Sequence, residues 1–211
     1  MSGAADARSA LALLDWRERV FGMYADVRAE SDPALAHARW RAARDALFHT
    51  HPQSPLPADS KAAFTGVPVA AYDPAYRFVC PIEDSPPEHR DVETGTDGVV
   101  SFDRVGHVRL GDLGTLDVWS ISGYGGGLFL PLRDATAGKT SYGGGRYVLD
   151  TRKGADLGAD PQTGTLVVDL NFAYHPSCAY DPAWACPLAP PGNVLTVPVN
   201  AGEQLPRAGW Y

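Results

Sequence analysis

The stretch from residue 99 to residue 132, VVSFDRVGHVRLGDLGTLDVWSISGYGGGLFLPL, decides the fold class of this chain. Short apolar runs alternate in it with turns that are rich in Gly and Asp. Such runs are typical of strands, and they predict strands at Val99–Arg104, His107–Leu110, Leu116–Ile121 and Leu128–Leu132. No helical pattern separates these runs, which favours antiparallel pairing.

The same pattern continues on both sides of this stretch. It predicts further strands at Arg77–Ile82, Arg146–Asp150, Thr165–Phe172 and Val194–Val199. Helical patterns come first in the chain and strands follow, which disfavours a parallel doubly wound sheet. The sequence therefore predicts a mainly β (α+β) fold, an antiparallel β-barrel or sandwich of about eight short strands preceded by two N-terminal helices.

The first part of the chain has a helical period. Apolar residues recur there at spacings of three and four, in two stripes: Leu13, Trp16, Val20, Met23 and Val27, then Ala36, Trp40, Ala43 and Leu47. Ser31-Asp32-Pro33 is a helix-start signal between the stripes, and the second helix should end before Pro52. We expect one domain over 1–211, with a helical segment (1–60) that packs on a β-barrel or sandwich (64–205).

Composition narrows the classes of partner. The chain has 211 residues, of which 45% are hydrophobic and 20% charged, as in ordinary globular proteins. The net charge of −7 disfavours a nucleic-acid partner, which needs a basic face. No apolar stretch has the length of a membrane span, and the first residues lack the pattern of a secretory signal. We expect a cytoplasmic protein without nucleic-acid or membrane partners, and its oligomeric state stays open.

The most unusual run is Thr140-Ser141-Tyr142-Gly143-Gly144-Gly145-Arg146-Tyr147. Three glycines allow close backbone approach or positive φ, and an arginine follows them at once. In a strand over 146–150, Arg146 and Asp150 share one face, and in the strand over 165–172, Asp169 and Asn171 lie on the polar face. If these strands were neighbours, the four side chains would form one polar surface at a barrel mouth.

That surface suggests catalytic and binding roles. Arg146 would hold a carboxylate or phosphate, and Asp169 would act as acid or base. The ligand-binding candidates are Tyr142, Gly143, Gly144, Gly145, Arg146, Asn171, Tyr174 and Tyr180. Two structural interpretations compete with this one: a solvated sheet face with ordinary ion pairs, or a buried Arg–Asp bridge that fixes strand order. No cofactor is predicted.

Cys178 and Cys186 lie in a segment rich in Tyr, Trp and Pro. They could be packed and inert, a reactive or redox pair, or metal ligands. A zinc site needs four suitable ligands, and His175 is the one histidine nearby, so no metal is predicted. Three functions therefore stay open. The first is a small-molecule-binding protein or an enzyme that acts on an anionic (carboxylate or phosphate) metabolite. The second is a non-catalytic interaction module that uses the segment Tyr174–Pro191, and the third is a thiol redox role of Cys178 and Cys186.

Several motifs occur together in order along the chain. They are HPQSPL (51–56), FLPLRD (129–134), TSYGGGRY (140–147), DLNFAY (169–174), CAY (178–180), CPL (186–188), PPGN (190–193) and AGE (201–203). In these motifs the sequence resembles an uncharacterised bacterial and archaeal family, the domain-of-unknown-function family numbered 1684. The resemblance extends from about residue 13 to residue 203. His175 departs from the pattern, where asparagine is expected. The resemblance implies a single domain with its site in the C-terminal half, and no activity.

Overall fold

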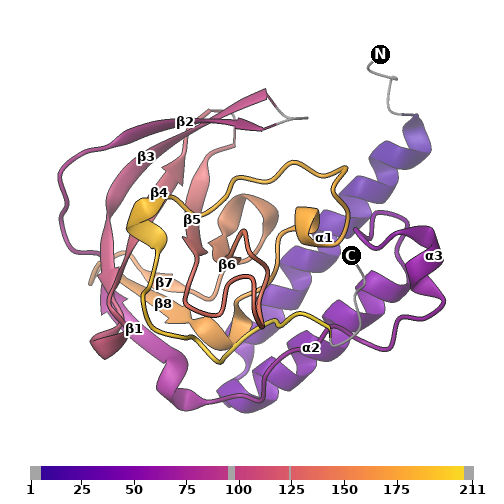
Figure 1. The fold of residues 1–211 in the computed structure, drawn as a ribbon, viewed down its shortest axis with the longest axis horizontal. Helices are drawn as coiled ribbons and strands as arrows, with labels where there is room; N and C mark the ends of the chain where they lie inside the picture. Colours follow the sequence, from indigo (N-terminus) through magenta and orange to yellow (C-terminus); the bar gives the residue numbers. More distant parts are fainter. Residues whose placement is uncertain (1–5, 95–97, 124, 207–211) are drawn as a thin grey trace.

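The fold is mainly β, with two antiparallel sheets and helices at the N-terminus (Figure 1). The computed structural model describes residues 6–94, 98–123 and 125–206. The strands are β1 (Arg77–Pro81), β2 (His89–Thr94), β3 (Gly98–Arg109), β4 (Thr115–Ile121), β5 (Gly127–Leu132), β6 (Arg146–Asp150), β7 (Ala159–Asp160) and β8 (Thr165–Asp169). Their order is β2-β3-β4-β5-β6 in one sheet and β1-β8-β7 in the other. Neither sheet closes on itself among the described strands, so the antiparallel fold is confirmed and a closed barrel is not found.

Two long helices form as their sequence signals predict. They are α1 (Ala7–Ala29) and α2 (Pro33–Thr50), and a short helix α3 (Ala58–Lys61) follows. Asp32 caps α2, because its carboxylate accepts hydrogen bonds from the backbone N–H groups of Ala34 (2.9 Å) and Leu35 (3.2 Å). None of the described helices combines the length and the apolar character that a membrane crossing requires.

The helices and both sheets share one hydrophobic core. Trp40 of α2 is 1% exposed, and it belongs to the same cluster as Val148 of β6 and Val168 of β8. The ring of Phe172 meets that of Trp40 edge to face, with centroids 5.2 Å apart. The buried members of the two apolar stripes therefore attach the helices to the sheets, whereas Leu13 and Ala43 lie exposed.

One predicted pair of strands is a single strand. The run Val99–Arg104 and all of His107–Leu110 except Leu110 fall in β3, whose register shifts between Arg104 and Gly106. A β-carbon at residue 106 would lie 2.4 Å from the carbonyl oxygen of Glu83, so glycine is required at this bulge. A strand with a bulge resembles two short strands in sequence, because the bulge interrupts the alternation.

Two other strand predictions are wrong in part or entirely. The strand predicted at Thr165–Phe172 ends at Asp169, because the Asp169 carboxylate accepts the backbone N–H of Asn171 (3.0 Å) and starts a 3₁₀ turn over Leu170–Phe172. The segment Val194–Val199 forms no strand. The strands β2 and β7 were not predicted, since neither has a run of apolar residues.

Both faces of β6 are covered, and all five of its residues are buried. Val148 packs in the main core, whereas Tyr147 packs in a second cluster with Phe102, Trp119 and Phe129. The side chain of Arg146 therefore enters the protein interior rather than the mouth of a barrel.

Candidate functional site

Arg146 is 1% exposed and its guanidinium is surrounded by protein acceptors. Its Nη2 donates to the carboxylate of Asp134 (2.7 Å) and to the carbonyl of Val199 (3.0 Å). Its Nη1 donates to the carbonyls of Ala201 and Glu203. Desolvating a charge is costly unless it is paired, and Asp134 provides the pairing. The Arg146 cation thus attaches the C-terminal segment to β6, and Figure 1 shows this yellow segment running toward α2.

Asp169 and Asn171 form a different cluster. The Asp169 carboxylate accepts hydrogen bonds from the Asn171 side chain (2.8 Å) and from the Tyr72 hydroxyl (3.3 Å). Asn171 in turn bonds both backbone groups of Asp73, at 2.9 Å and 2.8 Å. Burial raises the pKa of Asp169, while these donors and the cation of Arg77 lower it. The cluster fixes the segment before β1 to the end of β8.

The expected single polar surface is therefore wrong in its geometry. β6 pairs with β5 and β8 pairs with β1 and β7, so the two strands belong to different sheets. Asp150, the third expected member, caps a 3₁₀ turn by accepting the backbone N–H of Lys153 at 3.2 Å. Binding of a small anion by Arg146 and proton transfer by Asp169 stay predictions.

The triple glycine has a structural explanation. Gly145 has φ +94°, and a β-carbon there would lie 2.5 Å from the carbonyl oxygen of Leu132. At Gly144 a β-carbon would lie 2.5 Å from the ring of Tyr142. Gly143 accepts a hydrogen bond from Arg133 Nε at 3.1 Å through its carbonyl. The glycines let the backbone turn tightly into β6.

Glu203 is the centre of a buried network that sequence reasoning missed. It has no exposed surface, and its carboxylate pairs with Arg44 Nη2 of α2 at 3.2 Å and 3.3 Å. It also accepts the Tyr180 hydroxyl and the backbone N–H of His175. The Arg44 guanidinium lies 5.1 Å from the ring centre of Tyr174, so Tyr174 and Tyr180, both predicted to bind a ligand, lie in this network.

A signal for this network exists in the sequence. Arg44 stands four residues after Trp40, on the apolar face of its helix, where a charge needs a buried partner. Glu203 lies in the AGE motif. The sequence pattern marks Arg44 and Glu203 as unusual, but it cannot predict that they are in contact, because they are 159 positions apart in the chain.

His175 is buried as a neutral imidazole. Its Nε2 accepts the backbone N–H of Tyr142 at 3.1 Å, which leaves the proton on Nδ1. Burial lowers the pKa of His175 to about 4. Among the described residues, no group of three or more His, Cys, Asp or Glu side chains could hold a metal ion.

Cys178 and Cys186 lie against each other. The backbone N–H of Cys178 points at Cys186 Sγ, with N and S 3.4 Å apart, and the Cys178 thiol also bonds this sulfur. That thiol hydrogen bond lowers the pKa of Cys186 to about 6 and raises that of Cys178, while burial opposes the first shift and adds to the second. Both residues are partly exposed, whereas the third cysteine, Cys80, is buried in the core.

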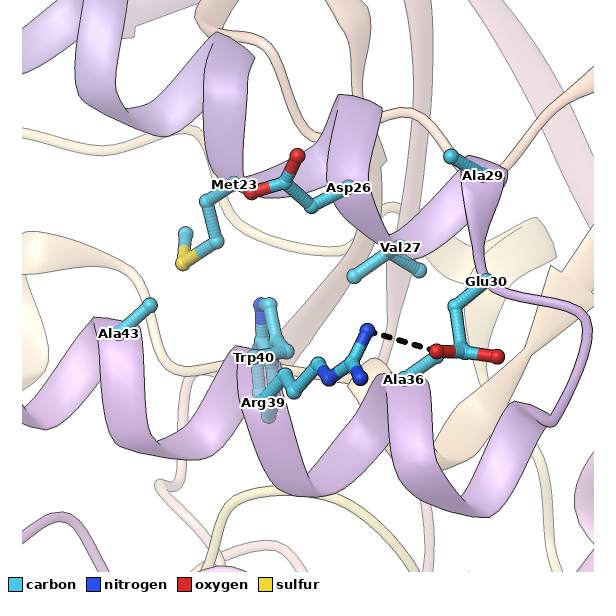
Figure 2. Close-up of a pocket in the computed structure, with 9 residues that line it drawn as sticks. All are labelled: Met23, Asp26, Val27, Ala29, Glu30, Ala36, Arg39, Trp40 and Ala43. Atoms are coloured by element: carbon cyan, nitrogen blue, oxygen red, sulfur yellow. Dashed lines mark hydrogen bonds and ion pairs between the residues drawn. The ribbon is translucent and has the colours of Figure 1, made fainter.

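A pocket lies elsewhere, between α1 and α2 (Figure 2). Its volume is about 230 Å³, and Figure 2 shows the Arg39 side chain pointing toward Glu30, with which it forms an ion pair at 2.6 Å. None of the predicted site residues lines this pocket.

These features define a class of protein: a two-sheet antiparallel β protein with N-terminal helices, a buried ion-pair network and a partly exposed pair of thiols. The chain belongs to the family described as a protein of unknown function (DUF1684), whose model matches residues 62–204. It is also similar to an uncharacterised protein of Haloarcula marismortui solved by NMR in solution. The two share 34% identity with a TM-score of 0.56, over 78% of this chain and 89% of the other. No curated protein matches.

Proposed function

We propose that this chain is a thiol redox protein in which Cys178 and Cys186 form a reversible disulfide. The observation that carries the proposal is the contact between the two residues, with the Cys178 backbone nitrogen 3.4 Å from Cys186 Sγ. A disulfide needs its two cysteines at close range, and these two are already in contact.

The surroundings of the pair support this proposal. Inert cysteines are among the most buried residues, whereas both of these are partly exposed. The lowered pKa of Cys186 favours the thiolate, which is the reactive form. The segment is held on both sides, because Tyr147 donates to the carbonyl of Pro187 at 2.5 Å and Tyr180 donates to Glu203.

The proposal assigns the cytoplasm as the compartment, because thiols are kept reduced there and a disulfide can form transiently. We therefore expect the pair to be reduced at rest and oxidised on exposure to a disulfide. The oxidation of this thiol pair would be the redox change by which the protein functions.

Alkylation and mass spectrometry test the proposal. The reduced protein is treated with glutathione disulfide in native buffer, and peptides are mapped without reduction. We expect one peptide that links Cys178 to Cys186, with Cys80 unmodified as the internal control. Cys178→Ser must abolish the link. If both thiols react only after denaturation and no linked peptide forms, the proposal is refuted.

A further inference from the structure

The two thiols of the pair have different surroundings. Cys178 lies in the 3₁₀ turn Ser177–Ala179, and its backbone N–H donates to Cys186 Sγ. The backbone N–H of Ser177 and the Cys178 thiol also donate hydrogen bonds to the Cys186 sulfur. Cys186 Sγ thus receives donors from the other cysteine, and a sulfur that receives several donors is stabilised as the anion.

Cys178 has the complementary surroundings. Its thiol donates a hydrogen bond to the Cys186 sulfur, so Cys178 stays protonated while that sulfur is an anion. Its own sulfur faces the hydroxyl of Tyr142, whose pKa burial raises to about 12. Tyr142 therefore keeps its proton, and its hydroxyl donates a hydrogen bond to the Cys178 sulfur.

We propose that Cys186 is the thiolate that attacks a low-molecular-weight disulfide and that Cys178 is the thiol that resolves the product. This inference rests on the proposed redox function and adds the order of reaction. In the first step Cys186 Sγ bonds one substrate sulfur, the substrate S–S bond breaks, and the other half leaves as a thiolate. In the second step the Cys178 sulfur loses its proton to solvent and attacks Cys186 Sγ. The second half then leaves, and the protein disulfide remains.

The contact between the sulfurs determines when the second step occurs. While Cys186 is an anion, a second negative charge beside it is disfavoured, so Cys178 stays protonated. Once Cys186 is bonded to the substrate, its charge is gone, and the Tyr142 hydroxyl and the backbone N–H of Cys178 itself are the donors near Cys178 Sγ. Tyr142 is therefore a positioning residue for the second step only.

Two variants that replace one sulfur by oxygen test the order. Cys178→Ser keeps a hydroxyl donor beside Cys186, and we expect it to accumulate a mixed disulfide with glutathione on Cys186. At pH 6 about half of Cys186 is thiolate, against under about 1% of an ordinary thiol. The lower nucleophilicity of a less basic sulfur cancels most of this advantage, which leaves about a ten-fold faster reaction than that of Cys178 in Cys186→Ser.

The outcomes separate this inference from the proposed function. If wild-type protein forms the linked peptide but Cys178 reacts as fast as Cys186 in the two variants, the order is wrong and the redox function stands. If no linked peptide forms, both fail. Tyr142→Phe should leave the first glutathione release unchanged and slow the second, as measured by free thiol against time. An equal effect on both releases would overturn the role of Tyr142.

Discussion

Replacing Glu203 by alanine tests whether the buried network holds the fold together. The change leaves the Arg44 guanidinium, whose side chain is 10% exposed, without a counter-ion. It also removes the acceptor of the Tyr180 hydroxyl and of the His175 backbone N–H. Removing one partner of a buried ion pair costs about 3–5 kcal/mol, which is a large part of the roughly 5–15 kcal/mol that stabilises a domain.

Urea denaturation followed by tryptophan fluorescence at pH 7 measures this cost. The matched control is Glu18→Ala, which removes an exposed carboxylate from α1 and should change the free energy of unfolding by about 0.5 kcal/mol or less. The double variant Arg44→Met/Glu203→Gln should lose less than the sum of its single variants, because neither partner is left charged and buried alone. A loss below about 1 kcal/mol for Glu203→Ala would refute the reasoning.

Further outcomes follow from backbone geometry and from buried imidazoles. Gly145→Ala should lower the free energy of unfolding by about 2 kcal/mol or more, because φ is +94° and the new methyl group would strike Leu132. Gly22→Ala, with nothing within 4 Å, should raise it by about 1 kcal/mol in the same urea assay. Burial lowers the pKa of His37 and of His175 to about 4 from 6.5, so the unfolded chain binds more protons between these values. Stability should therefore be full above pH 6.5 and fall as pH drops toward 4, as urea midpoints at pH 7, 5.5 and 4.5 would show; a flat profile would contradict this.

The parts of the fold that depend on local signals could be predicted from the sequence. Asp32 caps α2 through bonds to residues two and three positions away, and a stripe of apolar residues needs no knowledge of its partner. The polar strand His89–Thr94 could not be predicted this way. It is a strand because it pairs with β3, and its own residues show no apolar alternation. The end of β8 depends on whether Asp169 bonds its own backbone, which the alternation of residues does not reveal.

The candidate site could be predicted in position but not in connection. Arg146 stands out in the sequence because it follows three glycines, and in the structure because it is a buried cation. Its partner is nevertheless Asp134 rather than Asp169. The alternation within a strand gives the face on which a side chain lies. It does not say to which sheet the strand belongs. If a strand is assigned to the wrong sheet, the neighbours predicted for all of its side chains are wrong.

The buried network and the thiol pair are connected through the chain itself. Tyr180, two residues after Cys178, donates a hydrogen bond to Glu203. Pro187, one residue after Cys186, accepts a hydrogen bond from Tyr147. The loop between the cysteines is thus fixed near each end to residues of the core, and this fixes the distance between the sulfurs. Glu203→Ala should therefore weaken the thiol contact as well as the fold. In native buffer we expect it to slow formation of the Cys178–Cys186 link more than Glu18→Ala does, and equal rates would show that the loop holds the pair without its anchor.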